Sequence, residues 1–354
     1  MAYDIFSILY KAQDLKASDV HFTVGRPPVI RVRGELIPFG EELLSPEDNE
    51  KICYFLMTPE KQKVFEEKGE VDFSWSLPQT NRYRVNVYRQ RGSCTAALRM
   101  INTKIPTVEE LRLPLILNTM AMKPRGLFLV TGPTGSGKST TLAAMVGHIN
   151  NNRKCHILTI EDPIEYMHKH GKSLVNQREV GSDTQNFSNA LRSALREDPD
   201  VIMVGEMRDF ETVSIAITAA ETGHFVMSTL HTTTAAQTVD RIIDTFPPHQ
   251  QHQIRGQLST ALQGIVCQQL IKTADDTMIV PAMEVLIVND AVRNLIREGK
   301  THQIDTVLQT NIKNGMMPMD FSLAQLVKSK LITAEDAYSR CVDPDTFKRY
   351  LTGL

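Results

Sequence analysis

The sequence carries almost no net charge and has no long apolar run. Its 39 Lys and Arg residues nearly balance its 41 Asp and Glu residues, which gives a net charge of −2 and no reason to expect a nucleic-acid-binding protein, although local basic patches stay open. No apolar run approaches the length that spans a bilayer, and the N-terminus lacks the basic-then-apolar pattern of a signal peptide. We therefore expect a cytoplasmic protein without direct membrane insertion, which reaches any membrane through a partner.

Cysteines are few and widely separated. The chain has 5 of them, and no two form a Cys-x-x-Cys pair. This pattern indicates neither a disulfide framework nor a zinc site. Scattered free thiols fit the reducing environment of the cytoplasm.

Low-complexity tracts and internal repeats are also absent, so the 354 residues predict ordinary globular domains. A chain of this length suggests two domains, with room for a small third subdomain. We expect an N-terminal domain at 1–102, a linker at 103–118, a core at 119–288 and a helical C-terminal region at 289–354. The linker is predicted because prolines interrupt helical patterns on both of its sides.

A complete phosphate-loop motif lies between an apolar run at 126–131 and a helix-forming stretch that follows it. The octapeptide is Gly132-Pro-Thr-Gly-Ser-Gly-Lys-Ser139. A plain glycine-rich turn is the alternative, but the whole motif between a strand and a helix favours phosphate binding. The predicted nucleotide-binding residues are Gly132, Pro133, Thr134, Gly135, Ser136, Gly137, Lys138, Ser139 and Thr140.

These residue types suit a phosphate cradle. The glycines let successive N–H groups point into one concavity, and the start of the following helix adds its own free N–H groups. Lys138 can reach the outer phosphates, while the hydroxyl of Ser139 can bind Mg²⁺. The motif therefore predicts both ATP and Mg²⁺ as cofactors.

From the phosphate loop onward, the sequence alternates apolar strand patterns with helical ones. The predicted strands are 127–130, 156–160, 201–204 and 225–230. This alternation indicates a parallel sheet covered on both faces. Ligands of such sheets bind at the carboxyl ends of the strands, so the residues after each strand are the ones to inspect.

Polar side chains follow three of these strands. Glu161, Glu206 and His231 come after them, and His224 begins the last strand. Glu206 occupies the second acidic position of a phosphate-loop protein, where it can join Ser139 at the metal, activate the attacking water, or do both. Glu161 is the other candidate for the water, and His231 can sense the γ-phosphate. Each alone also fits a helix cap or a structural histidine, so the four are predicted catalytic residues because of their setting.

Residues 1–102 show short strand patterns between helices, which predict a small antiparallel sheet with helices on one face. Arginines are dense near the end of this region and continue into the predicted linker. Either they lie on a solvated face, or some of them reach the nucleotide across a domain or subunit boundary, which suits the bidentate guanidinium group. The candidates for the nucleotide are Arg82, Arg84, Arg99 and Arg112.

The C-terminal third reads as mainly helical. A long helical pattern runs over 251–270, and a strand is predicted at 281–288. Arg293 and Arg297 lie one turn apart on the helix that follows, where solvated arginines are the ordinary explanation.

Four motifs resemble those of the secretion-type ATPases: the Walker A motif, the acidic box, an atypical Walker B motif with Gly-Glu, and the histidine box. They lie at 132–140, 159–166, 201–209 and 222–231. In addition, Ala17-Ser-Asp-Val-His21 is similar to the N-terminal signature of these proteins. Ala291-Val-Arg-Asn-Leu-Ile-Arg-Glu298 is similar to a C-terminal element of the type IV pilus retraction ATPases.

The resemblance extends over nearly the whole chain. It implies an α/β protein with a PAS-like N-terminal domain, a RecA-like P-loop ATPase core and a helical C-terminal region. It also implies a homohexameric ring at the cytoplasmic face of the inner membrane, held there by an inner-membrane platform protein of the pilus machine, with a paralogous retraction ATPase as a further expected partner. We therefore predict an ATP-hydrolysing motor that powers type IV pilus retraction and twitching motility.

Other functions stay open at this point. One is a pilus assembly or type II secretion ATPase, against which the segment 291–298 argues. Another is an accessory subunit that binds nucleotide without hydrolysis and modulates a paralogous motor, against which the intact Lys138 and Glu206 argue. A hexameric DNA translocase is disfavoured by the slightly acidic net charge.

Overall fold

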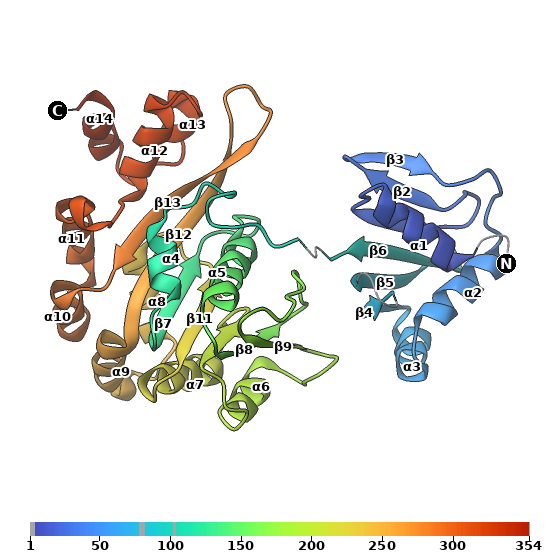
Figure 1. Ribbon diagram of the computed structural model, residues 1–354, viewed down its shortest axis with the longest axis horizontal. Helices are drawn as coiled ribbons and strands as arrows, with labels where there is room; N and C mark the ends of the chain where they lie inside the picture. Colours follow the sequence, from blue (N-terminus) through green and yellow to red (C-terminus); the bar gives the residue numbers. More distant parts are fainter. Residues whose placement is uncertain (1–3, 78–81, 102–103, 354) are drawn as a thin grey trace. The chain divides into compact units, whose positions relative to one another are not determined.

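The computed structural model describes residues 4–77, 82–101 and 104–353. The chain divides into two compact units (Figure 1). The first comprises residues 1–104 together with 163–167, and the second comprises residues 105–162 and 168–354. Among the described residues no helix has the length and apolar character needed to cross a membrane.

The first unit is built on an antiparallel sheet of six strands within the described residues, in the order β3-β2-β1-β6-β5-β4. Buried Tyr83, Val85 and Val87 alternate with polar residues along one strand, so a single face of the sheet meets the helices. The predicted α/β architecture is confirmed here. The elements are α1 (Ile5–Asp14), β1 (Asp19–Phe22), β2 (Val29–Val32), β3 (Glu35–Pro38), α2 (Pro46–Leu56), α3 (Pro59–Lys68), β4 (Glu70–Ser76), β5 (Arg82–Gln90) and β6 (Ser93–Met100).

The second unit contains a sheet of seven strands within the described part of the chain, in the order β13-β12-β7-β11-β10-β8-β9. Its strands are parallel except β13, which runs antiparallel to β12. The four predicted apolar strands are present as β7, β8, β10 and β11. The strands are β7 (Gly126–Thr131), β8 (His156–Glu161), β9 (Leu174–Glu179), β10 (Val201–Val204), β11 (Phe225–Leu230), β12 (Leu262–Lys272) and β13 (Ile279–Ile287).

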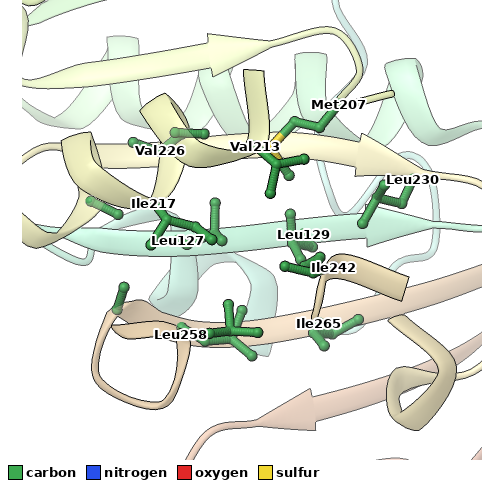
Figure 2. Packing of buried hydrophobic residues seen from close by; sticks show 14 of the residues in the cluster. Leu127, Leu129, Met207, Val213, Ile217, Val226, Leu230, Ile242, Leu258 and Ile265 are labelled. Atoms are coloured by element: carbon green, nitrogen blue, oxygen red, sulfur yellow. The ribbon is translucent and has the colours of Figure 1, made fainter. Parts of the chain in front are cut away.

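Apolar side chains cover both faces of this sheet. Successive residues of β7 point to opposite faces, so Leu127 and Leu129 belong to one core while Phe128 and Val130 belong to another. Figure 2 shows the first of these cores, where residues of β7, β11 and β12 pack against helical side chains. The covering helices are α4 (Ile116–Ala121), α5 (Lys138–Asn152), α6 (Phe187–Ala194), α7 (Phe210–Glu221), α8 (Ala235–Asp244) and α9 (Pro248–Ala261).

The predicted linker differs from the structure over most of its length. Residues from Ile105 onward belong to the second unit, where Val108, Leu113 and Leu117 are buried in the core that also contains α5. Apolar side chains at these positions stabilise packing on the sheet and are unsuited to a solvated linker. The short connection that remains includes residues 102–103, which lie outside the described residues.

The helix predicted over 251–270 is also shorter than expected. Helix α9 ends at Ala261, and β12 continues directly from Leu262. Gly264, near the start of β12, is closely surrounded by other parts of the unit. A Cβ atom there would lie 2.8 Å from Met120 Cε and 3.0 Å from the carbonyl oxygen of Leu286. The close approach of neighbouring strands, and not local helical propensity, decides the structure of this segment.

The C-terminal residues are helical, and they pack on the second unit. Helix α10 and helix α11 contribute to the core shown in Figure 2, whereas α12 and α14 pack beside the far ends of β12 and β13 (Figure 1). Pro318 immediately precedes α12 and so begins this helix. The helices are α10 (Asp290–Glu298), α11 (Ile304–Thr310), α12 (Met319–Lys328), α13 (Ala334–Tyr338) and α14 (Pro344–Thr352).

Candidate active site

The phosphate loop connects β7 to α5 through a backbone that requires glycine. Gly132, Gly135 and Gly137 all have positive φ, at 141°, 79° and 85°. Two of them also meet β12 closely: a Cβ atom on Gly132 would lie 2.3 Å from the carbonyl oxygen of Gln268, and one on Gly137 would lie 2.8 Å from Gln268 Nε2. The loop therefore keeps the concave shape predicted from the motif.

Lys138 lies within this concavity. Its Nζ donates hydrogen bonds to the carbonyl oxygens of Gly132, at 2.9 Å, and Pro133, at 3.0 Å. The side chain is thus folded back over the loop. A bound phosphate group can replace these carbonyl groups as the partner of the ammonium group. Helix α5 begins at Lys138 with no side-chain cap, so the positive end of its dipole faces the loop.

One hydroxyl group in the loop fits a bound phosphate. Ser136 Oγ is buried and has no hydrogen-bond partner among the described residues. Buried polar groups are nearly always paired in folded proteins, so unpaired ones at a binding loop point to a polar ligand. Ser139 follows Lys138 in the first turn of α5, directly after the phosphate loop.

The predicted carboxyl edge brings the remaining strand ends together. In the strand register, Thr131 pairs with Leu230, Ser228 with Val204, and Val204 with Ile160. Gly132 and His231 directly follow β7 and β11, Glu206 is the second residue after β10, and Glu161 is the last residue of β8. All four consequently lie along one edge of the sheet.

The carboxylate of Glu206 lies close to the side chains of Arg208 and His231. Arg208 Nε lies 2.8 Å from Glu206 Oε2, and His231 Nε2 lies 3.8 Å from the same oxygen. The glutamate side chain is 20% exposed, whereas that of Arg208 is 73% exposed. Glu206 is therefore held at the edge of the sheet beside the solvent-facing guanidinium group of Arg208. The sequence analysis did not single out Arg208, although it lies only two residues after Glu206.

Glu161 is buried at the end of β8. Its Oε1 accepts hydrogen bonds from Thr159 Oγ1, at 2.7 Å, and from Gln177 Nε2, at 3.1 Å. Only 8% of the residue is exposed. The carboxylate is consequently fixed in place, which a residue that orients water requires.

His224 lies at the other edge of the sheet. It precedes β11, its backbone carbonyl accepts from Gly126 N at the start of β7, and its Nδ1 lies 3.0 Å from the carbonyl oxygen of Ala219. The length of one strand, about 20 Å, separates it from the phosphate loop. Within one chain, His224 therefore contacts the end of α7 and lies away from the other predicted catalytic residues.

The predicted arginines fall in different units. Arg82, Arg84 and Arg99 lie in the first unit, on the face of the sheet opposite its apolar core, where Arg84 pairs with Arg99 in register. Arg99 Nε lies 3.0 Å from Asp19 Oδ1. Arg112 belongs to the second unit and adopts a positive φ of 56° in the turn before α4. The sheet face of the first unit therefore carries several arginines together with the carboxylate of Asp19.

Comparison with known proteins places these features in a family. The family described as type II/IV secretion system protein matches residues 95–306. The chain belongs to the type II/IV secretion system protein family. The type IV pilus retraction ATPase PilT of Pseudomonas aeruginosa is 47% identical over 344 residues, which are 97% of this chain and 100% of that protein.

Other family members are similar over the same extent. The twitching motility protein of Neisseria gonorrhoeae is 47% identical over 98% of this chain and 92% of its own length. The crystal structure of the pilus retraction motor PilT with bound ADP has a TM-score of 0.90 at 49% identity, and the match covers 98% of this chain and 99% of that chain. The resemblance to retraction ATPases inferred from the sequence motifs is confirmed, as are the α/β secretion ATPase fold and the prediction of an ATPase.

Proposed function

We propose that this chain is an ATP-driven motor that retracts type IV pili and thereby supports twitching motility. The observation that carries the proposal is the convergence of the phosphate loop, Glu161, Glu206 and His231 at one edge of the sheet, in a chain that is similar to retraction ATPases over nearly its whole length. Phosphate binding is assigned to residues 132–140. Hydrolysis is assigned to the acidic side chains.

Each side chain has a definite part in this proposal. Lys138 leaves the carbonyl groups of Gly132 and Pro133 and binds the outer phosphates, while the N–H groups of the loop bind their oxygens. Glu161 accepts a hydrogen bond from the attacking water and so orients it. His231 donates a hydrogen bond to the γ-phosphate. Its Nε2 lies 3.8 Å from Glu206 Oε2, so the histidine contacts both the phosphate and the carboxylate.

Ser139 and Glu206 would hold Mg²⁺, which supplies positive charge to the phosphates and to the leaving group. The fit rests on the donor set, because hydroxyl and carboxylate oxygens are the ligands this ion prefers. The buried, unpaired hydroxyl group of Ser136 supports a phosphate bound beside it. Glu206 would need to exchange its contact with Arg208 for the ion or its bound water.

The assembled state is also part of the proposal. We assign a homohexamer at the cytoplasmic face of the inner membrane, docked on a platform protein of the pilus machine, with a paralogous retraction ATPase as an additional partner. Arginines of the first unit, among them Arg82, Arg84 and Arg99, would complete the nucleotide site together with Arg112. Their concentration on one sheet face supports this role.

A steady-state ATPase assay of the purified chain tests the chemistry. Glu206→Gln is expected to keep nucleotide binding and to lose turnover by roughly 10²–10⁴-fold, because the amide keeps the shape and loses the charge. Lys138→Ala should instead weaken nucleotide binding, measured by titration with a fluorescent ATP analogue. Asp209→Asn is the matched control, since Asp209 caps α7 through Thr212 and lies outside the proposed chemistry. Turnover near the wild-type rate in Glu206→Gln would move the assignment to Glu161.

A further inference from the structure

The carboxylate of Glu161 is held by a small hydrogen-bonded group that lies outside the proposed nucleotide contacts. Thr159 Oγ1 and Gln177 Nε2 both donate to Glu161 Oε1, at 2.7 Å and 3.1 Å. Thr159 is fully buried and Glu161 almost so. Inside a protein such hydrogen bonds to a carboxylate are stronger than in water, because the surroundings screen them less.

The geometry of two parallel strands brings these three side chains together. Thr159 and Glu161 are two residues apart on β8, so they share one face of the sheet. Gln177 occupies the position on β9 that pairs with Thr159. The two donors therefore approach the same carboxylate oxygen from the strand of Glu161 and from its neighbour.

A third hydrogen bond fixes the orientation of the glutamine. The backbone N–H of His168 donates to Gln177 Oε1 at 2.8 Å. An amide whose oxygen accepts at one end presents its NH₂ group at the other, so this contact directs Nε2 toward Glu161. Rotation of the amide by half a turn would replace both hydrogen bonds with repulsive pairs.

We infer that Thr159 and Gln177 are positioning residues, which hold the carboxylate of Glu161 in the one orientation that aligns the attacking water. The inference rests on the role of Glu161 proposed above. A carboxylate at the end of a strand has several rotamers of similar energy, and hydrolysis requires one of them. The two donors select that rotamer before the nucleotide binds, so removal of either lowers the rate of the chemical step and not the binding of ATP.

Steady-state and single-turnover ATPase measurements on the full chain test this inference. Thr159→Val and Gln177→Glu each remove one donor while keeping the size of the side chain. Gln177→Glu also keeps an acceptor for His168 and places a second carboxylate beside Glu161. We expect kcat to fall by roughly 10–100-fold in each, with KM for ATP within about twofold of the wild-type value. Thr159→Ser restores a hydroxyl donor and should recover most of the rate.

Two comparisons separate positioning from a general loss of structure. Asn176→Ala is the matched control on β9, because Asn176 Nδ2 contacts His156 Nε2 and not Glu161; its kcat should equal that of the wild type. On a Glu161→Gln background, Thr159→Val and Gln177→Glu should add little further loss, since the carboxylate they orient has been removed. Equal fold losses on both backgrounds would overturn the inference.

The same variants distinguish failure of this inference from failure of the proposed function. If Glu161→Gln keeps wild-type turnover, the proposed role of Glu161 is wrong and the positioning inference falls with it. If Glu161→Gln loses turnover while Thr159→Val and Gln177→Glu keep the wild-type kcat, only the positioning inference is overturned. If Thr159→Ser is as slow as Thr159→Val, the hydroxyl group is not what matters, and the inference is again overturned.

Discussion

At the scale of single residues, the site depends on which side chains contact each acidic group. Glu206 faces Arg208 and His231, whereas Glu161 faces the neutral donors Thr159 and Gln177. A carboxylate whose partner is an exposed guanidinium group can exchange that partner for a metal ion. A carboxylate among fixed neutral donors suits the orientation of water. The different surroundings therefore support different roles for the two glutamates.

His231 gives a prediction at this scale. We expect His231→Ala to reduce the affinity for a non-hydrolysable ATP analogue by about tenfold while changing the affinity for ADP by less than about twofold, since its proposed partner is the γ-phosphate. Isothermal titration calorimetry with both nucleotides measures this. His224→Ala is the control, because His224 lies at the opposite edge of the sheet. Equal losses for both nucleotides would contradict the assigned contact.

Several site residues follow from the sequence and others do not. The positions of the phosphate loop, Glu161, Glu206 and His231 were predictable because each ends an apolar strand or follows one within two residues, and parallel strands end at one edge. Gln177 was not, since β9 is an edge strand of mainly polar residues and gives no apolar run. His224 precedes β11 and His231 follows it, so the two histidines of this motif lie at opposite edges of the sheet.

At the scale of elements, Glu284 connects β13 to the start of α8. Its Oε1 accepts a hydrogen bond from Ala235 N at 2.7 Å, and the side chain is buried. Burial raises the pKa of Glu284 to about 7, and the negative charge of Asp305 adds to the shift, while the N–H of Ala235 opposes it. Helix α8 follows the loop that starts at His231, so this contact anchors the element beside the active site.

Glu284 gives a prediction for stability. In the unfolded chain the pKa of this carboxyl group is near 4.5. Its contribution to the free energy of unfolding is therefore fully present below pH 4.5, and it is lost as the pH rises through about 7. Glu284→Gln keeps the acceptor for Ala235 and does not ionise. Relative to the wild type, the free energy of unfolding of this variant should therefore increase by up to about 3 kcal/mol between pH 4.5 and pH 7.

Urea unfolding of both proteins at a series of pH values measures this difference. The comparison with the wild type matters because His168 acts in the opposite direction: burial lowers its pKa to about 4, so it destabilises the fold as the pH falls below 6.5. Since His168 is present in both proteins, its effect cancels. A difference that stays constant with pH would show that Glu284 does not change protonation on folding.

Arg293 shows how one element ends against another. Its Nη1 donates to the carbonyl oxygens of Ser259, at 2.8 Å, and Thr260, at 2.9 Å, in the last turn of α9. These carbonyls lack partners within the helix, and a cation there also faces the negative end of the helix dipole. The sequence alone favoured solvated arginines on this helix; Arg293 instead caps α9.

We expect Arg293→Ala to lower the free energy of unfolding by about 1–2 kcal/mol, because it removes two charge-assisted hydrogen bonds. Arg297→Ala, one turn along on an exposed position of α10, should change it by less than about 0.5 kcal/mol. Chemical denaturation of the two variants makes the comparison. Equal stability of both variants would remove the structural role of Arg293.

The helices and strands themselves were predictable where one pattern governed them. The four apolar strands were confirmed. The segment after Ala261 was not predictable, because its strand is set by contacts with β7 and β13 that are distant in sequence. Residues 105–118 likewise look like a linker until the core that buries Leu113 and Leu117 is known.

At the scale of the whole molecule, the proposed function requires more than one chain. The acidic residues and the phosphate loop come from the second unit, whereas Arg82, Arg84 and Arg99 come from the first. Arginine supplied by a neighbouring subunit is worth roughly 10³–10⁵ in rate in other phosphate-loop enzymes. A head-to-tail contact that closes on itself gives a ring, which supports the proposed hexamer.

Mixed oligomers test this arrangement. Chains with Glu206→Gln are mixed with chains in which one of the four arginines is replaced by alanine, each inactive alone. We expect the mixture to regain part of the wild-type ATPase rate, because some interfaces then join an intact catalytic half to an intact arginine. No recovery with any of the arginines, together with full activity of a dilute monomer verified by light scattering, would show that each chain contains a complete site.

The most direct test of the account is the pilus phenotype of cells that depend on this chain. The gene is deleted in its source organism, and the deletion strain is then complemented with the wild-type sequence or with Glu206→Gln. Surface pili are counted and twitching motility is measured in all three strains. The account predicts abundant pili without twitching in the deletion and in Glu206→Gln, and normal behaviour with the wild-type sequence. Loss of pili from the surface in the Glu206→Gln strain would contradict it, because that result assigns the motor to assembly and not to retraction.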